Sequence, residues 1–302
     1  MTIEKKVTAG TGLTAPDKEF TFNVTVEDFA DSTVNAVLHT PNAQDEEQQL
    51  AFDENGTASF KLKADQSLEI PDIQNHSYAV EEVNVPDGFT SAVPDNARGT
   101  AGTSDITVTF TNSYNVEVLS VDPETDLGVS GTKSMTGRDF KTGDTFTFRI
   151  SAETAGAPLP GNTDVTINPS SGTEKAFAFV DDITFTKPGQ YSYLIQEINP
   201  NAETGGSGLA GVSYDGTQYR LIVDVADNGD GTLAQTHELF KGERGAAGIT
   251  WTHVDDGAIA FENVYHAESV QISFRSQKNL TGKTLEDNSY TFVLSAGGSR
   301  IA

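Results

Sequence analysis

Residues 129–136 read Val-Ser-Gly-Thr-Lys-Ser-Met-Thr, an alternating run in which a lysine stands where an apolar side chain is expected. Side chains of a β-strand point alternately to its two faces, so Val129, Lys133 and Met135 share one face. That face is otherwise apolar and is predicted to turn toward a core, where an unpaired amine is costly. Lys133 therefore needs buried partners from other strands.

Two later runs carry polar groups on their apolar faces. The run 193–197, Tyr-Leu-Ile-Gln-Glu, places Glu197 in register with a tyrosine and an isoleucine. The run 259–263, Ile-Ala-Phe-Glu-Asn, places Asn263 in register with an isoleucine and a phenylalanine. Both side chains are expected to point inward, so the core that receives Lys133 also receives a carboxyl group and a carboxamide.

The same order of lysine, glutamate and asparagine occurs earlier and begins again near the end. In residues 1–114 the corresponding positions are held by Lys5, Glu82 and Asn112. Each lies on the same face of its expected strand as the apolar residues. Lys278 ends a run in which apolar residues again alternate with polar ones. A unit repeated at this spacing indicates tandem domains built on one plan.

The repeat divides the chain. We expect one domain at 1–114, an acidic connector at 115–128, a second domain at 129–266, and the truncated start of a third similar domain at 267–302, since two strands cannot bury a core.

Alternating runs without a 3.6-residue apolar period predict an all-β fold, with a hairpin turn at 227–231, Asp-Asn-Gly-Asp-Gly. Strands are expected at 19–25, 58–64, 67–70, 77–83 and 105–112, and at 145–150, 176–180, 190–197, 218–225 and 258–264.

Composition excludes several classes of function. The 302 residues include 44 acidic and 19 basic ones, a formal charge of −25 that disfavours nucleic acid and anionic membrane surfaces as partners. The absence of cysteine excludes disulfides and thiolate metal sites, and the five histidines show no ligand spacing, so we expect no cofactor and no metal. No apolar run approaches the roughly 20 residues that span a bilayer, so no membrane insertion is expected in this piece.

A buried lysine, glutamate and asparagine can react with one another. Full burial can lower a lysine pKa from about 10.4 to near 7, which corresponds to roughly 4–5 kcal/mol, and it raises a glutamate pKa. The neutral amine can then attack the carboxamide with loss of ammonia, while the acid polarises the carbonyl and carries a proton to the leaving nitrogen. Fixing the groups in a folded core supplies the effective concentration. Lysine is thus the predicted nucleophile, asparagine the electrophile and glutamate the catalyst.

A second interpretation involves no reaction. The three side chains can equally form a buried Lys–Glu ion pair that the asparagine bridges, an arrangement that costs desolvation and adds little stability. The sequence leaves both interpretations open.

The motifs around these residues resemble the CnaB-type and FctA-type isopeptide-forming pilin and adhesin domains of Gram-positive bacteria. The resemblance covers almost the whole chain, and its specificity lies in the ordered triplet. In residues 129–266 it is carried by Lys133-x-Met-x-Gly, Phe177-x-Phe, Pro188-Gly-x-Tyr-x-Tyr-x-Ile-x-Glu197, Tyr214-Asp-x-Thr-x-Tyr219 and Phe261-x-Asn-x-Tyr265. In residues 1–114 it is carried by Gly56-x-Ala-x-Phe-x-Leu, Tyr78-x-Val-x-Glu82 and Phe110-x-Asn-x-Tyr114.

The resemblance implies tandem Ig-like (CnaB-type) β-sandwiches, the first CnaB-like and the second of the FctA pilin type. It also implies two intramolecular isopeptide bonds and their catalytic glutamates, namely Lys5–Asn112 with Glu82 and Lys133–Asn263 with Glu197. Lys278 has the sequence context of such a lysine but no glutamate or asparagine to pair with, so it is expected to stay a free amine.

The function implied is the structural stalk of a cell-surface pilus subunit or fibrillar adhesin. Such a protein is extracellular, is anchored to the cell wall by a segment outside this sequence, and contacts neighbouring repeats of the same surface protein. It is not an enzyme with turnover, because the chemistry acts once on its own chain. The alternative is an adhesin module that recognises a host protein or glycan, for which the insertions at Asp28–Gln48 and Asn199–Gly211 are the candidates.

Overall fold

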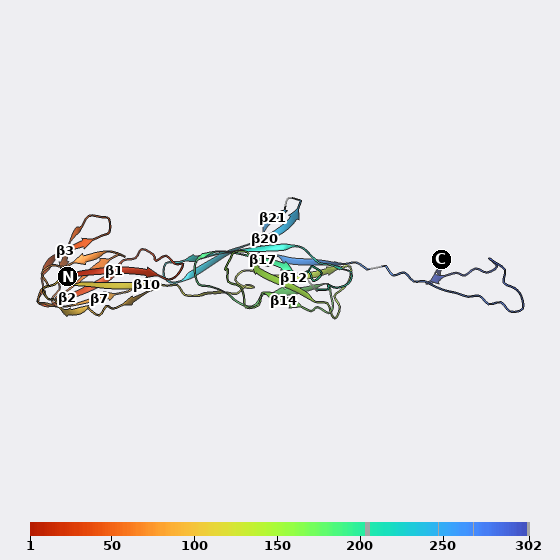
Figure 1. The fold of residues 1–302 in the computed structure, drawn as a ribbon, viewed down its shortest axis with the longest axis horizontal. Helices are drawn as coiled ribbons and strands as arrows, with labels where there is room; N and C mark the ends of the chain where they lie inside the picture. The colour runs from red at the N-terminus through yellow and green to blue at the C-terminus, as the bar shows by residue number, and fades with distance from the viewer. Residues whose placement is uncertain (203–205, 247, 268, 301–302) are drawn as a thin grey trace. The chain divides into compact units, whose positions relative to one another are not determined.

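A computed structural model of the chain describes residues 1–202, 206–246, 248–267 and 269–300. Every regular element in these ranges is a β-strand (Figure 1), and the chain divides into two units, Met1–Tyr265 and His266–Ala302. The first unit contains two hydrophobic cores, each between a pair of facing sheets. The prediction of an all-β fold with tandem sandwiches is confirmed.

The first sandwich pairs a six-stranded sheet, in the order β4-β3-β6-β1-β10-β8, with a four-stranded sheet, in the order β5-β2-β7-β9. Its strands are β1 (Thr2–Ala9), β2 (Phe20–Val26), β3 (Thr33–His39), β4 (Glu46–Ala51), β5 (Thr57–Leu62), β6 (Ser67–Glu69), β7 (Ser77–Val83), β8 (Phe89–Ala92), β9 (Arg98–Thr100) and β10 (Thr107–Tyr114). The first and last strands, β1 and β10, lie side by side and parallel (Figure 1).

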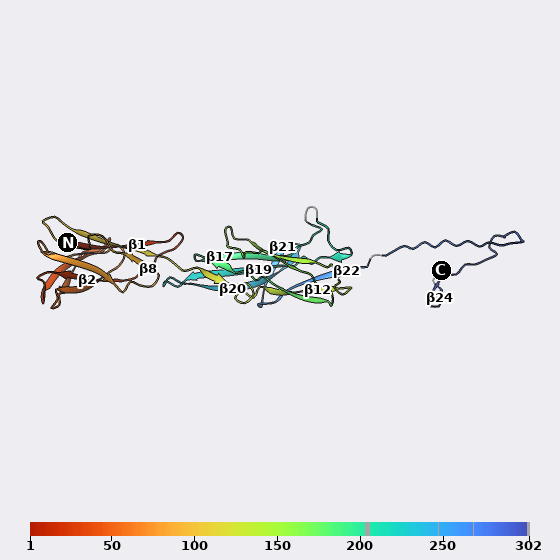
Figure 2. The same ribbon diagram turned by 90° about the horizontal axis from the view of Figure 1, so that it is seen from below.

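The second sandwich repeats this arrangement with the sheet sizes exchanged: four strands in the order β15-β12-β22-β18 face six in the order β14-β13-β17-β19-β20-β21. The strands of these two sheets are β12 (Ser130–Thr136), β13 (Phe146–Ala152), β14 (Asp164–Ile167), β15 (Glu174–Ala178), β17 (Gly189–Glu197), β18 (Val212–Ser213), β19 (Gln218–Asp227), β20 (Leu233–Gly245), β21 (Gly248–Val254) and β22 (Ile259–Tyr265). The strands β11 (Leu119–Val121) and β16 (Ile183–Phe185) form a separate two-stranded sheet. Here β12 and β22 are the parallel pair (Figure 2).

Alternation of apolar and polar residues explains why these runs are strands. In β2, Phe20, Phe22 and Val24 are buried while the residues between them are half-buried. Their aromatic rings lie against rings from neighbouring strands; Phe22, for example, stacks on Phe60 at 5.5 Å. Each of the ten expected strands overlaps a strand of the structure. Residues 228–232 join β19 to β20 in an antiparallel hairpin, so the expected turn at 227–231 is displaced by one residue.

Two segments contain more structure than the sequence indicated. The segment Asp28–Gln48 contains β3 and the start of β4, which extend the six-stranded sheet. The expected connector, residues 115–128, contains β11, which pairs with β16 and places Val121 in the second core. The segment Asn199–Gly211 lies partly outside the described residues.

The expected third repeat does not form its opening strand. Within residues 269–300 the only strands are β23 (Ser295–Ala296) and β24 (Ser299–Arg300), which pair with each other. Val270, Ile272 and Phe274 are 82%, 68% and 66% exposed. The expectation of an inward-facing strand there is wrong for the described residues, because no second sheet covers this run and no strand pairs with it. Residues 268, 301 and 302 of the expected unit lie outside the described ranges.

Candidate cross-linking sites

The parallel pairing of β12 with β22 brings Lys133 and Asn263 to the same patch of the second core. Lys133 is opposite Phe261 and Met135 is opposite Asn263, so the asparagine lies one pleat further along the face that carries the lysine. Both side chains are fully buried. The sheet thus delivers the amine and the carboxamide from its two central strands.

Glu197 completes this site from the facing sheet. It ends β17, opposite Phe148 of β13, and its side chain is fully buried. Its Oε2 lies 3.0 Å from Lys133 Nζ, and its Oε1 accepts a hydrogen bond of 2.9 Å from Asn263 Nδ2. One carboxyl group therefore touches both the amine and the amide nitrogen.

The first sandwich builds the same arrangement on the same register. In β1 and β10, Lys5 is opposite Phe110, and Val7 is opposite Asn112. Glu82 of β7 lies opposite Phe22 of β2, just as Glu197 lies opposite Phe148. The two sites are therefore related by strand pairing as well as by the order of their residues.

Contacts in the first site follow the same scheme. Glu82 Oε1 lies 3.0 Å from Lys5 Nζ and accepts a hydrogen bond of 2.9 Å from Asn112 Nδ2. The contact with Lys5 is close, but its angles do not meet hydrogen-bond geometry. Ser91 of β8, opposite Asn112 in the ladder, donates its hydroxyl to Glu82 Oε2. Both glutamate oxygens are thus engaged.

Burial sets the electrostatics of the second site. Desolvation lowers the pKa of Lys133, an effect that the nearby Glu197 carboxylate partly opposes. Desolvation likewise raises the pKa of Glu197, against the opposing effect of Lys133. Both directions favour a neutral amine beside a neutral acid. In the first site desolvation lowers the pKa of Lys5 in the same way.

Aromatic rings keep these amines out of water. Lys133 Nζ lies 5.2 Å from the centre of the Phe146 ring, and Lys5 Nζ lies 4.2 Å from the centre of the Phe20 ring. Each ring belongs to the Phe-Thr-Phe run of its domain and is 1% exposed. The desolvation that shifts the lysine pKa therefore has an identifiable source in each sandwich.

The sequence did not indicate one group that contacts the second site, the backbone N–H of Asp215. This N–H donates a hydrogen bond of 2.7 Å to Asn263 Oδ1. Asp215 belongs to the run Tyr214-Asp-x-Thr-x-Tyr219, which carried the family resemblance but had no role assigned. In the first site, among the described residues, Asn112 Oδ1 has no hydrogen-bond partner.

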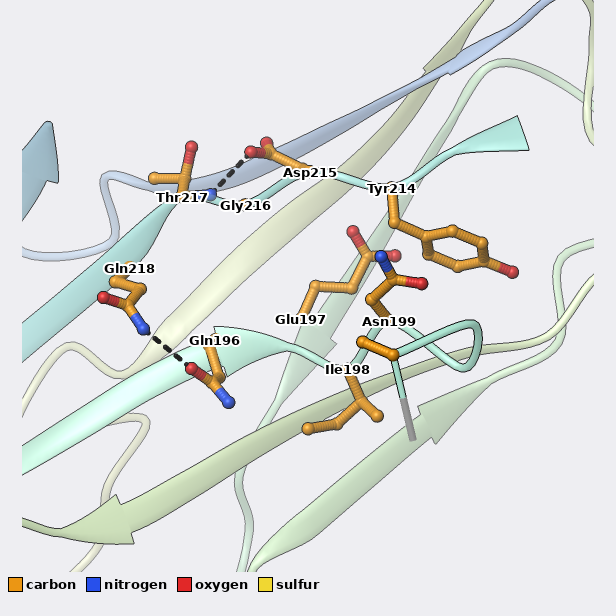
Figure 3. Close-up of a pocket in the computed structure, with 10 residues that line it drawn as sticks. Gln196, Glu197, Ile198, Asn199, Tyr214, Asp215, Gly216, Thr217 and Gln218 are labelled. Atoms are coloured by element: carbon orange, nitrogen blue, oxygen red, sulfur yellow. Dashed lines mark hydrogen bonds between the residues drawn. The ribbon is translucent and has the colours of Figure 1, made fainter. Parts of the chain in front are cut away.

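A pocket of about 270 Å³ borders the second site and is lined by Glu197 and by residues on both sides of it, including Tyr214 and Asp215. Figure 3 shows Glu197 pointing from the end of β17 toward the loop of Tyr214 and Asp215. The residue whose carboxyl group touches Lys133 and Asn263 thus also lines this pocket.

The remaining sequence expectation concerns Lys278. Its side chain is exposed and its Nζ lies 5.1 Å from the centre of the Tyr290 ring, so it does not share the buried setting of the other two lysines. Within the described ranges, no cluster of three or more histidine, cysteine or acidic residues could hold a metal ion. None of these residues forms a helix that is long and apolar enough to cross a membrane.

Two family models match the chain. Residues 129–266 match the Spy0128-like isopeptide containing domain, and residues 1–114 match a domain of unknown function, DUF7601. No curated protein matches the sequence. The two matches cover the segments that contain the two buried triplets.

Solved structures of pilus proteins overlap parts of the chain. The pilus-presented adhesin Spy0125 (Cpa) is 24% identical over 37% of this chain, with a TM-score of 0.29, and the chain spans only 27% of that adhesin. The major pilin from Streptococcus pyogenes is 14% identical over 88% of this chain and 98% of its own, with a TM-score of 0.22. Residues 129–266 belong to the family of Spy0128-like isopeptide-containing domains.

Proposed function

We propose that this chain is a stalk region of a Gram-positive cell-surface pilus subunit or fibrillar adhesin, stabilised by two self-formed isopeptide bonds, Lys5–Asn112 and Lys133–Asn263. The observation that carries the proposal is the contact of one buried carboxyl group with both reactants in each sandwich. Its partners are neighbouring repeats of the same surface protein, and its location is the cell surface.

The reaction can be followed atom by atom in the second site. Lys133 Nζ, as a neutral amine, attacks Cγ of Asn263, and the Nζ–Cγ bond forms while the Cγ–Nδ2 bond breaks. One amine proton passes through the Glu197 carboxyl group to Nδ2, which leaves as ammonia. Glu197 ends in the protonation state in which it began. Its two oxygens already touch the donor and the acceptor of that proton.

Stabilisation follows from where the bonds lie. Each bond would join the first and the last strand of its sandwich, so it closes a loop that contains almost the whole domain. By the chain-entropy relation for cross-links, a loop of about 100 residues adds up to about 4–5 kcal/mol. For a protein under tension the covalent path between the ends of each domain matters more, because it bypasses the folded strands.

Intact mass under denaturing conditions tests the proposal. We expect the parent chain to be lighter than its calculated mass by two ammonia masses, and Glu82→Ala and Glu197→Ala each by one. Glu82→Gln and Glu197→Gln, which keep the size of the side chain, should give the same result in a folded protein. A parent chain at its full calculated mass would leave only the buried ion pairs.

Each site has a matched control, a glutamate next to one of its residues in the sequence: Glu81 precedes Glu82, and Glu262 precedes Asn263. Glu81 and Glu262 are exposed and lie on the outer faces of β7 and β22. Glu81→Ala and Glu262→Ala should lose both ammonia masses, like the parent chain. If either control retained an ammonia, the loss would not depend specifically on the buried carboxyl groups.

A further inference from the structure

The carboxamide of Asn263 is held in a single orientation by two neighbours of opposite character. Its Oδ1 accepts the backbone N–H of Asp215 at 2.7 Å, while its Nδ2 donates to Glu197 at 2.9 Å. Turning the amide over would set Nδ2 against an N–H donor, which no hydrogen bond can satisfy. The electrophilic carbonyl therefore faces Asp215, and the leaving nitrogen faces the proton carrier.

The side chain of Asp215 holds this N–H in place. Its Oδ2 accepts the backbone N–H of Glu262 at 2.7 Å, and its Oδ1 accepts the backbone N–H of Thr217 at 2.8 Å. The second of these bonds is drawn in Figure 3. Asp215 thus bonds to two successive residues of β22. Its side chain accepts the backbone N–H of Glu262, and its own backbone N–H donates to the side chain of Asn263.

We propose that the Asp215 N–H stabilises the negative charge that develops on Asn263 Oδ1 when Lys133 attacks, and that the Asp215 side chain is the positioning group for this N–H. This rests on the proposed function and adds to it a means of activating the carbonyl. The sequence predicted that role for the glutamate, but Glu197 contacts the amide nitrogen of Asn263 and Asp215 contacts its oxygen. A backbone N–H at 2.7 Å is the geometry that stabilises oxyanions in acyl transfer, where removing one such donor typically slows the reaction about 100- to 1,000-fold.

The first sandwich lacks this donor. Ser91 occupies the ladder position opposite Asn112, and its hydroxyl is donated to Glu82 instead of to the amide oxygen. Asn112 Oδ1 has no hydrogen-bond partner in the described part of the chain. The two sites share their reactants and their glutamate, so the proposal implies that the second bond forms faster than the first.

The test follows bond formation in the full chain during cell-free synthesis, quenched in denaturant and read by intact mass. The Glu82→Ala background leaves only the Lys133–Asn263 reaction, and the pH is set where its half-time is resolved. Asp215→Ala should slow this reaction about 10-fold or more, because the N–H is no longer held. Asp215→Asn, which keeps an acceptor for the N–H of Thr217 or Glu262, should restore much of the rate.

A pH profile separates positioning from charge, since the Asp215 carboxylate also favours the protonated forms of Lys133 and Glu197. Both variants remove this charge, so both can shift the profile along the pH axis. Under the proposal, Asp215→Ala also lowers the maximum rate of the profile, whereas Asp215→Asn keeps a maximum close to that of the parent. If both variants shifted the profile and kept the same maximum rate, the carboxylate would act through its charge alone and the proposal would be wrong. Equal rates for Asp215→Ala and its parent would also overturn it.

A matched control tests for a general effect of losing such a turn. Asp230 accepts the N–H of Thr232 two residues on, as Asp215 does for Thr217, but it belongs to the hairpin turn between β19 and β20. Asp230→Ala should leave the rate unchanged, and a similar slowing there would remove the specific role of Asp215. If the Glu82→Ala background lost no ammonia at all, it is the proposed function that would fail, whatever Asp215 does.

Discussion

Burying Lys133 and Glu197 together has a cost that depends on pH. For Lys133 the pKa is lowered from 10.5, so its unfavourable contribution to folding grows as pH falls from 10.5 to the folded value. For Glu197 the pKa is raised from 4.5, so its unfavourable contribution grows as pH rises from 4.5 to the folded value. Both costs are present together between these limits, around neutral pH.

This predicts a stability minimum in a chain that cannot form the bond. Asn263→Ala should be least stable near neutral pH relative to the variant Lys133→Met/Glu197→Leu/Asn263→Ala, with a gap of about 1–4 kcal/mol in favour of the apolar variant. The measurement is the free energy of unfolding of both variants in denaturant across pH. The contributions of all other titrating groups cancel in the difference between the two free energies. If Asn263→Ala, which keeps the ion pair, were most stable relative to the apolar variant at neutral pH, the result would contradict the direction of both pKa shifts.

At the scale of residues, the alternation of apolar and polar residues along the strands predicted which polar side chains lie in the two cores. Strand parity alone selects Lys5 over Lys6, because Lys5 alternates with apolar residues. The structure buries Lys5 fully, whereas Lys6 is partly exposed and pairs with the half-buried Glu4 and the exposed Asp65. The Asp215 contact could not be predicted, since a backbone N–H has no sequence signature. The same alternation predicted a buried position for Lys278, and this prediction was wrong. An alternating strand buries one face only when another sheet covers that face.

At the scale of elements, the site depends on a parallel contact between strands that are distant in the sequence. The register of β12 on β22 sets how far Lys133 lies from Asn263, and a slip of one residue would turn one of them out of the core. This register could not be read from the sequence, which shows which residues face inward but not which strands are neighbours. The order of the sheets depends in the same way on contacts across the whole domain.

Gly131 permits β12 to lie close to its neighbours. A Cβ at this position would meet the backbone oxygen of Ile259 at 2.5 Å and the ring of Phe177 at 2.8 Å. Gly131→Ala should therefore move β12 away from β22, destabilise the second sandwich by about 1–3 kcal/mol, and slow its ammonia loss. Thermal unfolding and intact mass measure the two effects.

The control for this prediction is a glycine of the same sandwich with open space around it. A Cβ on Gly216 would meet nothing within 4 Å, so Gly216→Ala should change stability by no more than about 0.5 kcal/mol. If Gly131→Ala were equally neutral, the close approach of β12 to β22 would not be what fixes their register.

At the scale of the molecule, the two sandwiches meet through the end of one and a hairpin of the other. The hydroxyl of Tyr114, the last residue of β10, donates to Asp227 Oδ1 at 2.6 Å and accepts the N–H of Gly231 at 3.3 Å. A Cβ on Gly88 would come within 2.6 Å of the backbone nitrogen of Gly231. The Asp-Asn-Gly-Asp-Gly turn thus packs against the first sandwich close to where β10 passes into the connector.

Under tension the proposed bonds would decide which parts of the chain can extend. In each sandwich the first and last strands are parallel neighbours, so pulling on the two ends shears them along their length. With the bonds formed, the load passes from β1 through Lys5–Asn112 to β10, and then from β12 through Lys133–Asn263 to β22. The residues between each lysine and its asparagine carry no load and cannot lengthen the chain.

Single-molecule stretching of the chain therefore distinguishes bonded from unbonded sandwiches one at a time. The parent should show neither long extension step. Glu197→Gln should release the segment between Lys133 and Asn263, about 450 Å at full extension, and Glu82→Gln the segment between Lys5 and Asn112, about 370 Å, with each variant keeping the other domain locked. Glu262→Ala should stretch like the parent. Only a covalent link between the first and last strands can prevent the residues between each lysine and its asparagine from extending. A long step in the parent would therefore show that the buried triplets hold these strands by packing and charge alone.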